Sequence, residues 1–259
     1  MECREEGKNF QRLIDIVAKL RKECPWDREQ TNQSIKKNLI EEAYELLEAI
    51  EENNNKEMIE ELGDVLLQVV FHSQIKKDEG SFDINDVIKY LIDKLIYRHP
   101  HVFGEKQIKD VEEVLNQWDK LKQKEKNRKS ILDGIPKRMP ALMRATKVQK
   151  KAAKVGFDWT DTDLILDKVK EEIQELKEAK TKQELKHEFG DILIALVNLG
   201  RHLGIDPEEA LHEATDRMVS RFQYIEKKAK KLGKSLEEMH LEEMDKYWEE
   251  AKQLEKQNK

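Results

Sequence analysis

The sequence predicts an all-α protein made of two tandem helical domains. Few turns interrupt the chain, because its 259 residues include only 10 glycines and 5 prolines. Charged residues make up 39% of the chain and hydrophobic residues 38%. The hydrophobic residues recur at helical spacing, which is typical of packed helices and not of disordered chains. The same motifs also occur twice in the same order, which indicates an internal duplication.

Composition argues against several classes of function. The formal net charge is −6 and both signs are interspersed, so the chain lacks the basic surface of a nucleic-acid-binding protein. The N-terminus is charged and the longest apolar runs are too short to span a bilayer, so we expect a cytoplasmic protein without membrane contact. Cys3 and Cys24 fit neither a disulfide framework nor a zinc site, and we expect free thiols.

The repeated motifs define the domain organisation. A highly charged stretch over residues 122–130, followed by a glycine and two prolines, indicates a boundary. We therefore expect domains over residues 1–125 and 146–259, joined by a linker over residues 126–145. Each half contains a Glu-Glu-x-x-Glu motif, then a Glu-x-Gly-Asp motif, then an Asp followed by two basic residues at i,i+4 spacing. The three motifs occupy residues 41–45, 61–64 and 93–98 in the first half and residues 171–175, 188–191 and 216–221 in the second.

In the first half, a helix that ends before residues 53–55 carries Glu42 and Glu45, which share one face because they are three residues apart. The next helix is apolar almost all round between residues 61 and 73, which predicts that it is buried. Its exceptions form one narrow polar line: Glu61, Asp64, Gln68 and His72. The second half has Leu199 in place of His72, so we favour a structural histidine over a ligand.

The second half repeats this arrangement around a turn at Thr181 and Lys182. At a rise of about 1.5 Å per residue, acids at similar distances from the turn reach similar heights on two antiparallel helices. Four carboxylates should therefore converge in each half. The predicted sets are Glu42, Glu45, Glu61 and Asp64 in the first half, and Glu172, Glu175, Glu188 and Asp191 in the second.

Four convergent carboxylates form an oxygen-rich site for a hard cation, Mg²⁺ or Mn²⁺. Carboxylates on apolar helices are costly to bury unless they are paired or bound to a metal. Magnesium often takes phosphate oxygens as its remaining ligands, which points to a nucleotide or polyphosphate substrate. Two basic pairs on later helices could grip phosphates, although surface salt bridging is a serious alternative. The pairs are Lys94 with Arg98, and Arg217 with Arg221.

Other interpretations stay open. Solvated charge without a function would explain one acidic motif, but a duplicated set on apolar helices argues against it. A di-iron site would use Glu-x-x-His motifs, which occur at residues 184–187 and 209–212 and only in the second half. A regulatory nucleotide-binding protein would bind triphosphates with little or no turnover. Trp248 could either stack on a base or belong to the core.

These motifs resemble the MazG family of nucleoside triphosphate pyrophosphohydrolases in its two-domain form, relatives of the dimeric all-α dUTPases. The segments Cys-Pro-Trp-Asp-Arg-Glu-Gln-Thr at 24–31, Arg-His-Pro-His-Val-Phe at 98–103 and Val-Gly-Phe-Asp-Trp at 155–159 extend the resemblance over essentially the whole chain. It implies four-helix-bundle cores completed by homodimerisation. It also implies hydrolysis of nucleoside triphosphates between the α and β phosphates, giving the monophosphate and pyrophosphate.

The resemblance carries over residue by residue. The four acids of each half would bind magnesium, and Glu45 or Glu175 is the candidate general base. Position 217 carries Arg where the family has Lys, which preserves the charge. The second half is the preferred catalytic half, because its acids are level around their turn and it includes Asn198. The candidate substrate-binding residues are Lys94, Arg98, Arg217, Arg221 and Trp248.

No motif recognises a base edge, so we expect broad base specificity. The expected role is removal of damaged nucleotides or control of a nucleotide pool.

Overall fold

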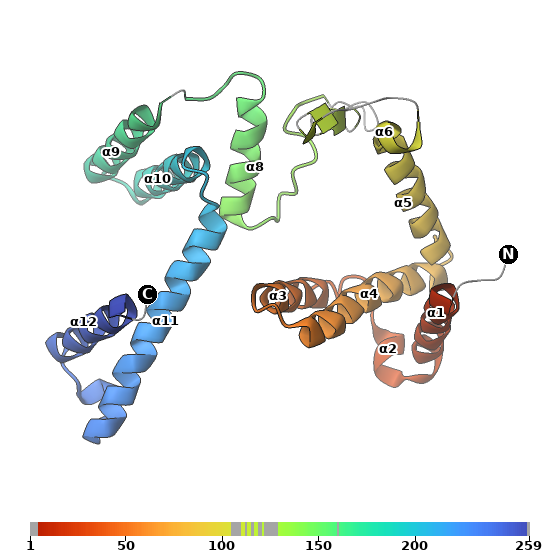
Figure 1. The fold of residues 1–259 in the computed structure, drawn as a ribbon, viewed down its shortest axis with the longest axis horizontal. Helices are drawn as coiled ribbons and strands as arrows, with labels where there is room; N and C mark the ends of the chain where they lie inside the picture. Colours follow the sequence, from red (N-terminus) through yellow and green to blue (C-terminus); the bar gives the residue numbers. More distant parts are fainter. Residues whose placement is uncertain are drawn as a thin grey trace. The chain divides into compact units, whose positions relative to one another are not determined.

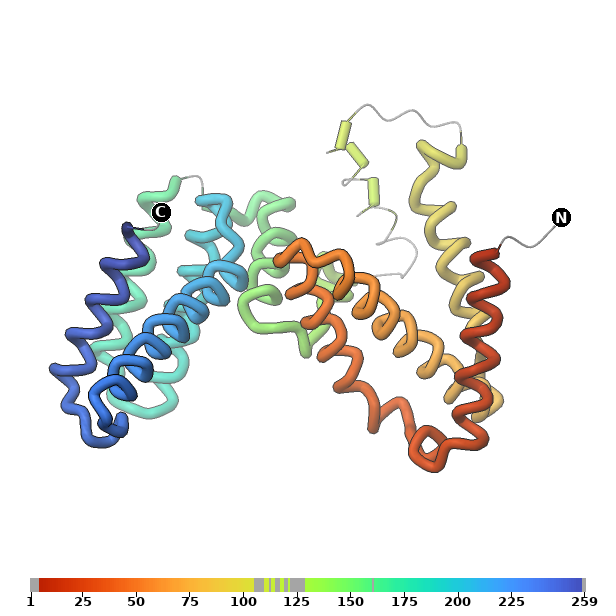
Figure 2. The backbone as a smooth tube through the Cα atoms, turned by 60° about the horizontal axis from the view of Figure 1, so that its bottom comes forward, coloured from red at the N-terminus to blue at the C-terminus, as the bar shows by residue number. Residues whose placement is uncertain are grey.

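A computed structural model describes residues 5–104, 110–111, 113–114, 117–118, 121, 129–159 and 161–257. Cys3 and residues 126–128 of the expected linker lie outside this part, while Cys24 is a half-buried free thiol. The described residues form α-helices and one 3₁₀ turn, with no strand among them, which confirms the all-α prediction. The chain divides into two compact units, Met1–Lys122 and Gln123–Lys259, each with its own helices (Figures 1 and 2).

In the first unit, α3 and α4 form an antiparallel pair (Figure 1). The turn between them is possible because Asn53 adopts a left-handed conformation, with φ 52°, which asparagine tolerates better than most residues. Asn54 then caps α4 by accepting a hydrogen bond from the backbone N–H of Glu57. The helices are α1 (Glu5–Glu23), α2 (Pro25–Glu29), α3 (Asn38–Glu51), α4 (Asn55–Asp78), α5 (Ile84–Arg98) and α6 (Pro100–Phe103).

The core of the first unit lies where α1, α4 and α5 meet. Arg21 of α1 ties the following segment to this core, because its guanidinium donates to the backbone oxygen of Gln30 at 2.9 Å and pairs with Asp78 of α4 at 2.9 Å. The cluster of buried side chains consists of Val17, Ile35, Val70, Phe71, Ile75 and Ile84.

In the second unit, α9 and α10 form the corresponding antiparallel pair, and α11 packs along α12 (Figure 1). Thr181 and Glu184 form a capping box at the start of α10, and Gly233 ends α11 with a left-handed φ of 69°. The elements are α8 (Ala141–Ala153), α9 (Thr162–Glu178), α10 (Lys182–His202), α11 (Pro207–Leu232), a 3₁₀ turn (Leu236–Glu238) and α12 (Leu241–Gln257).

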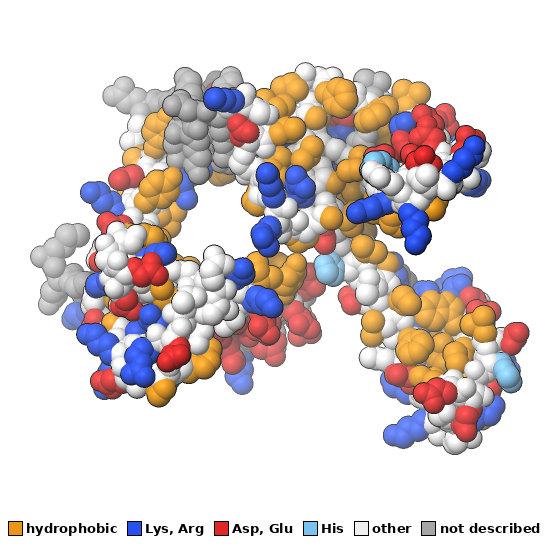
Figure 3. All heavy atoms as spheres, turned by 180° about the vertical axis from the view of Figure 1, so that it is seen from behind, with side chains coloured by type: hydrophobic (Ala, Val, Ile, Leu, Met, Phe, Trp, Pro, Cys, Tyr) orange, Lys and Arg blue, Asp and Glu red, His pale blue; other side chains and the backbone are white. Residues whose placement is uncertain are grey.

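The expected burial of α4 and α10 is fulfilled on one face only. Val70 and Val197 are each 1% exposed, but Leu62, Phe189 and Leu193 are 52%, 57% and 40% exposed. Apolar side chains therefore remain on the surface of both units (Figure 3). The described helices of each unit cover one face of its helix pair and leave these side chains exposed. None of the described helices is long and apolar enough to cross a membrane.

Candidate functional site

The first acidic cluster lies between α3 and α4. Ligand atoms of Glu42, Glu45 and Glu61 all lie within 4.8 Å of one another. Asp64, one turn further along α4, stays outside this tight group, yet its charge acts on both Glu42 and Glu61. The helical pairing thus brings together three of the four predicted acids and places the fourth beside them.

The second acidic cluster lies between α9 and α10. Three of its four predicted acids converge, but they are not the counterparts of the three that converge in the first cluster. Glu172, Glu188 and Asp191 have ligand atoms within 4.8 Å of one another. Glu172 is buried, with 6% exposure, whereas Glu175 is exposed and responds to the charges of Glu172 and Glu188. The two units therefore share the motif but differ in which side chains converge.

Crowding of like charges shows in the pKa values of three carboxyl groups. The pKa of Glu61 is raised mainly by burial and then by the charges of Glu45 and Asp64. Burial is also the largest cause that raises the pKa of Glu42 and of Glu175, with added repulsion from neighbouring acids. In addition, Glu61 Oε2 is buried and has no hydrogen-bond partner. Such an orphaned oxygen in an acidic cluster fits a cation ligand.

Glu42 and Glu172 occupy equivalent positions in the two acidic motifs but contact different side chains. In the first unit, buried Gln68 donates from Nε2 to Glu42 Oε1 at 3.2 Å. In the second unit, the Lys168 ammonium lies 2.8 Å from Glu172 Oε1 and 2.8 Å from Glu171. Hydrogen bonds to these two acids raise the pKa of Lys168, so it stays protonated. A permanent cation therefore lies beside the second cluster.

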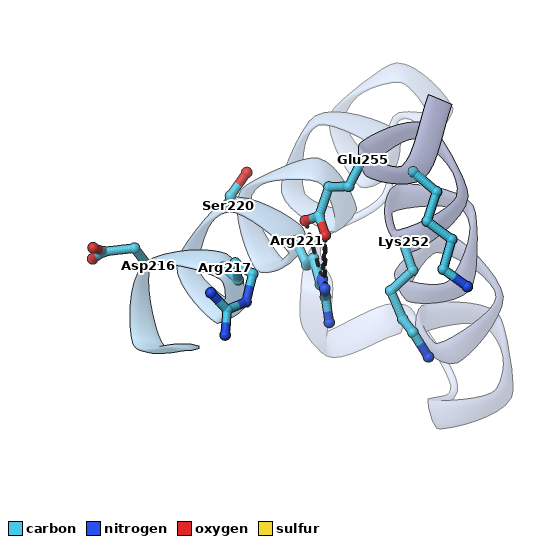
Figure 4. A pocket seen from close by; sticks show the side chains of 7 residues that line it. Asp216, Arg217, Ser220, Arg221, Lys252 and Glu255 are labelled. Carbon is cyan, nitrogen blue, oxygen red and sulfur yellow. Dashed lines mark hydrogen bonds and ion pairs between the residues drawn. The ribbon is translucent and has the colours of Figure 1, made fainter. Parts of the chain in front are cut away.

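The predicted phosphate-binding residues of the second half lie in a separate groove of about 710 Å³. Arg217 and Arg221 lie one turn apart on α11 (Figure 4). Arg221 pairs with Glu255 of α12, with Nη2 2.7 Å from Oε2, and this hydrogen bond raises the pKa of Arg221. The acids of the second cluster lie on α9 and α10, whereas the groove is lined by residues of α11 and α12. These lining residues are Asp216, Arg217, Ser220, Arg221, Lys252, Glu255 and Lys256.

Of the two roles that the sequence left open for Trp248, the structure supports the core role. Trp248 packs against the buried cluster of Ile225, Ala229 and Met239. Its ring also lies under the Arg221 guanidinium, 5.4 Å from the ring centroid to Cζ, a cation–π distance. Trp248 thus helps to hold Arg221 in the groove.

In the first unit, α5 carries Lys94 and Arg98. The Lys94 ammonium lies 5.9 Å from the ring centroid of Tyr90.

His72 of α4 is bonded to Asn32, whose Nδ2 lies 2.7 Å from His72 Nδ1, and burial lowers the pKa of His72. These contacts favour the structural interpretation of His72.

The sequence interpretation missed several residues around the second cluster. Lys168 stands four residues before Glu172, and that helical spacing could have revealed the pair. Asn198, which the sequence interpretation had named, contacts Arg201 three residues further along α10, but the contact of Arg201 with Asp158 has no local spacing, because these two residues are 43 apart. Arg201 Nη1 lies 2.9 Å from Asp158 Oδ2, and Arg201 Nη2 lies 2.7 Å from Asn198 Oδ1. The Arg201 hydrogen bonds hold the pKa of Asp158 down to about 2.

Comparisons with known proteins match both units. Residues 30–103 match the MazG nucleotide pyrophosphohydrolase domain, and residues 139–218 match the phosphoribosyl-ATP pyrophosphohydrolase family. The chain is 49% identical over 253 residues to the nucleoside triphosphate pyrophosphohydrolase/pyrophosphatase MazG of Thermotoga maritima, covering 96% of this chain and 98% of that protein. It is 43% identical to the nucleoside triphosphate pyrophosphohydrolase of Escherichia coli K12, covering 94% and 97%.

Two further matches cover less. The chain is 52% identical to the uncharacterized protein YabN of Bacillus subtilis, covering 96% of this chain and 53% of that protein. A solved structure of a MazG-related protein from Thermotoga maritima is 26% identical, with a TM-score of 0.40 over 44% of this chain and 98% of that one. The two full-length matches, together with the duplicated acidic helix pairs, show that the chain belongs to the MazG family of nucleoside triphosphate pyrophosphohydrolases.

Proposed function

We propose that this chain is a magnesium-dependent nucleoside triphosphate pyrophosphohydrolase that cleaves between the α and β phosphates. The observation that carries the proposal is the pair of three-carboxylate clusters, each on an antiparallel helix pair. Full-length relatives named as nucleoside triphosphate pyrophosphohydrolases support the same activity. The products would be a nucleoside monophosphate and pyrophosphate.

The acidic clusters fit a hard divalent cation. All their donor atoms are carboxylate oxygens, which suit magnesium or manganese better than a soft metal. Glu42, Glu45 and Glu61 would hold the ion in the first unit, and Glu172, Glu188 and Asp191 in the second, with Asp64 and Glu175 close by. A bound magnesium ion supplies Lewis-acid stabilisation of phosphate charge and lowers the pKa of a bound water.

The remaining chemistry falls to side chains of the chain itself. Glu45, a member of the first cluster, or Glu175, which lies beside the second, can accept a proton from water, because both carboxylates are exposed. The Lys168 ammonium pairs with Glu172, and it would be available to neutralise a phosphate oxygen if that carboxylate held a cation. Arg217 and Arg221 offer guanidinium groups suited to bidentate phosphate contacts.

Metal dependence tests this proposal. We expect pyrophosphate release from a panel of nucleoside triphosphates with Mg²⁺ or Mn²⁺ and none after EDTA treatment, because the clustered carboxylates repel the phosphates unless a cation lies between them. Turnover that persists in EDTA at the rate seen with magnesium would contradict the metal assignment. Calcium serves as the matched ion, since it binds oxygen ligands with less rigid geometry.

The raised carboxyl pKa values predict how metal binding depends on pH. Protons and metal compete for the same oxygens, so the affinity for Mn²⁺ should fall as the pH is lowered from about 7.5 to about 5. Manganese binding followed by electron paramagnetic resonance at the two pH values measures this. An affinity independent of pH would contradict the cluster assignment.

The stability of the metal-free chain should depend on pH in the opposite direction, rising as the pH is lowered. A raised pKa in the folded state means that the group favours folding below its unfolded pKa and that this contribution is lost as the pH rises. Without metal, the melting temperature should therefore rise on acidification more in the wild type than in Glu42→Gln/Glu61→Gln, which lacks two of these carboxyl groups.

The exposed apolar stripes support a homodimer. On α11, Leu211, Met218 and Phe222 recur at helical spacing and are 56%, 60% and 42% exposed, and α4 and α10 carry similar stripes. Apolar surface of this extent is typical of an interface, and two helix pairs brought face to face form a four-helix bundle. We infer that a second copy covers these stripes and brings the α11–α12 groove of one chain to the second cluster of the other.

We propose broad base specificity for the whole chain, and the different surroundings of its two clusters are compatible with it. Gln68 contacts the first cluster, whereas Lys168 contacts the second, so the two units would select nucleotides differently. We propose a role in removing damaged nucleotides or in controlling a nucleotide pool. Growth of a deletion strain under nucleotide-damaging conditions distinguishes these roles from one with a single substrate.

A further inference from the structure

The helix α8 and the segment before it are basic without a balancing number of acids. Residues 129–154 contain eight Lys and Arg but a single acid, Asp133, in a chain whose formal net charge is −6. Elsewhere in the second unit a lysine pairs with an acid three residues away on the same helix, as Lys168 does with Glu171 at 2.8 Å. Residues 141–154 contain no acid that could form such a pair.

The basic side chains of α8 share its outward face. Four of them fall within an arc of about 120° on a helix of 3.6 residues per turn, and all four are exposed. This basic face consists of Arg144, Lys147, Lys150 and Lys154. The opposite face packs on α10 and α11 (Figure 1) and includes the buried Thr146. Within the part of the chain that the structure describes, no acid pairs with Arg144, Lys147 or Lys150, so their charges stay uncompensated.

The helix dipole does not account for these charges. Positive side chains stabilise a helix in its last turn, where Lys150 and Lys151 of α8 lie. Arg144 lies at the other end, because its backbone N–H bonds to the oxygen of Pro140 in the first turn of the helix. A positive charge at that end is unfavourable for the helix itself. The basic face therefore has no local stabilising role that would explain it.

The segment before α8 is held against the helix and adds to its charge. The Lys151 ammonium donates to the backbone oxygens of Ile131 at 2.6 Å and Asp133 at 3.3 Å. The Asp133 carboxylate accepts from two backbone N–H groups of its own turn, each at 2.9 Å. The single acid of this stretch is thus used to fix the turn. Lys137 and Arg138 follow it and are both exposed.

We propose that the basic face of α8 binds the phosphate backbone of double-stranded DNA without reading its sequence. Lys and Arg are the usual phosphate contacts in such complexes. Four charges over the roughly 15 Å from Arg144 to Lys154 are of the same order as the one phosphate per 3.4 Å of a DNA strand. The inference goes beyond the proposed function and does not rest on it.

The uncharged polar side chains of α8 explain why the sequence would not be read. Thr146 donates to the backbone oxygen of Leu142 at 2.9 Å, and Gln149 donates to that of Ile194 at 2.9 Å. Both side chains therefore bond within the unit, and the basic face carries no amide or hydroxyl. Base edges in DNA grooves are read mainly by such groups and by bidentate arginine, so the lysine-rich face is suited to phosphates.

Other anionic partners fit the basic face less well. Lysine is depleted at interfaces between proteins, whereas interfaces with DNA are much more positively charged. A helix that lies on a membrane must insert its apolar face, but that face of α8 packs on α10 and α11. Single-stranded nucleic acid is bound largely by aromatic stacking, and residues 141–154 include no aromatic side chain.

The proposal departs from the expectation that the chain does not contact nucleic acid. That expectation rested on the net charge of −6, which sums over the whole chain. Charges further away than a Debye length of about 8 Å at physiological salt are largely screened. The potential at the basic face is therefore set by its own side chains and not by the acids of distant helices.

Fluorescence anisotropy of a labelled DNA duplex tests the proposal on the full chain, at about 50 mM and about 200 mM salt. Arg144→Gln/Lys147→Gln/Lys150→Gln removes three charges of the basic face and keeps long side chains of good helix propensity. Lys147→Arg/Lys150→Arg keeps both charges. The matched control, Lys227→Gln/Lys230→Gln/Lys231→Gln, removes three charges from exposed positions at the end of α11.

We expect the wild type and Lys147→Arg/Lys150→Arg to bind the duplex with a dissociation constant on the order of 1 μM at the lower salt. The triple variant of the basic face should bind at least about thirtyfold more weakly and lose most of its salt dependence, because fewer counterions are released. The control triple variant should stay within about threefold of the wild type. If the triple variant of the basic face melts at a lower temperature, Lys147→Gln/Lys150→Gln alone should still bind about tenfold more weakly.

Four results would overturn the proposal. The wild type could fail to bind the duplex at the lower salt, or the control triple variant could lose as much affinity as the triple variant of the basic face. A loss in Arg217→Ala/Arg221→Ala and not in α8 would place the DNA in the groove of α11 and α12. Preferential binding of single-stranded DNA or of phosphatidylserine vesicles would assign the face to another partner.

Pyrophosphate release separates this inference from the proposed function. Measured without DNA, release should be the same in the wild type and in the triple variant of the basic face, which also shows that the variant is folded. A chain that binds the duplex through α8 but releases no pyrophosphate would support this inference and contradict the proposed function. Release by a wild type that does not bind the duplex would do the reverse.

Discussion

Replacing Glu172 and Asp191 by Gln and Asn should lower the rate of pyrophosphate release about a thousandfold, because it removes two of the three convergent carboxylates of the proposed metal site. The substitutions preserve shape and remove charge, so the helix pair should stay folded. The matched pair Glu42→Gln/Glu61→Gln removes two ligands of the first cluster and should lower the rate less than about tenfold. Initial rates at saturating magnesium and triphosphate measure both effects.

The reason for expecting asymmetry is electrostatic. The second cluster has a buried ligand, Glu172, and a permanent cation, Lys168, beside it, whereas the first has the neutral Gln68. A phosphate chain that reaches the second cluster therefore meets positive charge as well as metal. Glu178→Gln on the surface of α9 controls for general effects of charge removal. Equal thousandfold losses in both double variants would contradict the preference for the second unit.

Replacing Arg217 and Arg221 by Ala should lower kcat/KM about a hundredfold, because two charge-assisted phosphate contacts are lost. Arg221 is already fixed by Glu255 and Trp248, so little ordering is needed when phosphate binds. The loss should appear mainly in KM. Arg144→Ala, on the exposed surface of α8, is the control for removing a positive charge elsewhere in the same unit.

Mixing two impaired variants at a triphosphate concentration well below KM tests whether the groove completes a site on a second copy. One variant carries Arg217→Ala/Arg221→Ala and the other Glu172→Gln/Asp191→Asn. If arginines and acids meet across a homodimer, each mixed dimer has one intact site, and random exchange should restore about a quarter of the wild-type rate. Sedimentation should give twice the chain mass of 30.6 kDa. No recovery in a mixture shown to exchange would place the arginines and acids of one site on the same chain.

Spacing along the chain predicted the acidic clusters because helices are regular. Glu45 and Glu61 stand at similar distances from the turn at residues 53–55, and their ligand atoms do meet. Spacing alone could not say which three acids converge, because that depends on the phase of two helices about their axes and on side-chain rotamers. Asp64 is left out of the tight group in one unit and Glu175 in the other.

Contacts between distant segments were beyond sequence reasoning. The bond from Arg201 to Asp158 joins α10 to a loop before α9, and no local periodicity encodes it. The groove of α11 and α12 likewise lies apart from the carboxylates that it was expected to serve, because the basic pair faces α12. The exposure of Leu62 and Leu193 likewise depends on which other described helices pack against α4 and α10, which the sequence pattern does not encode.

The identity of the products tests the central claim most directly. Wild-type chain would be incubated with a nucleoside triphosphate and Mg²⁺, and the phosphorus products followed by nuclear magnetic resonance. Cleavage between the α and β phosphates predicts one nucleoside monophosphate and one pyrophosphate per triphosphate consumed, with both absent in a variant lacking the carboxylates of both clusters. Nucleoside diphosphate with inorganic phosphate, or tight metal-dependent binding of every triphosphate without any product, would contradict it.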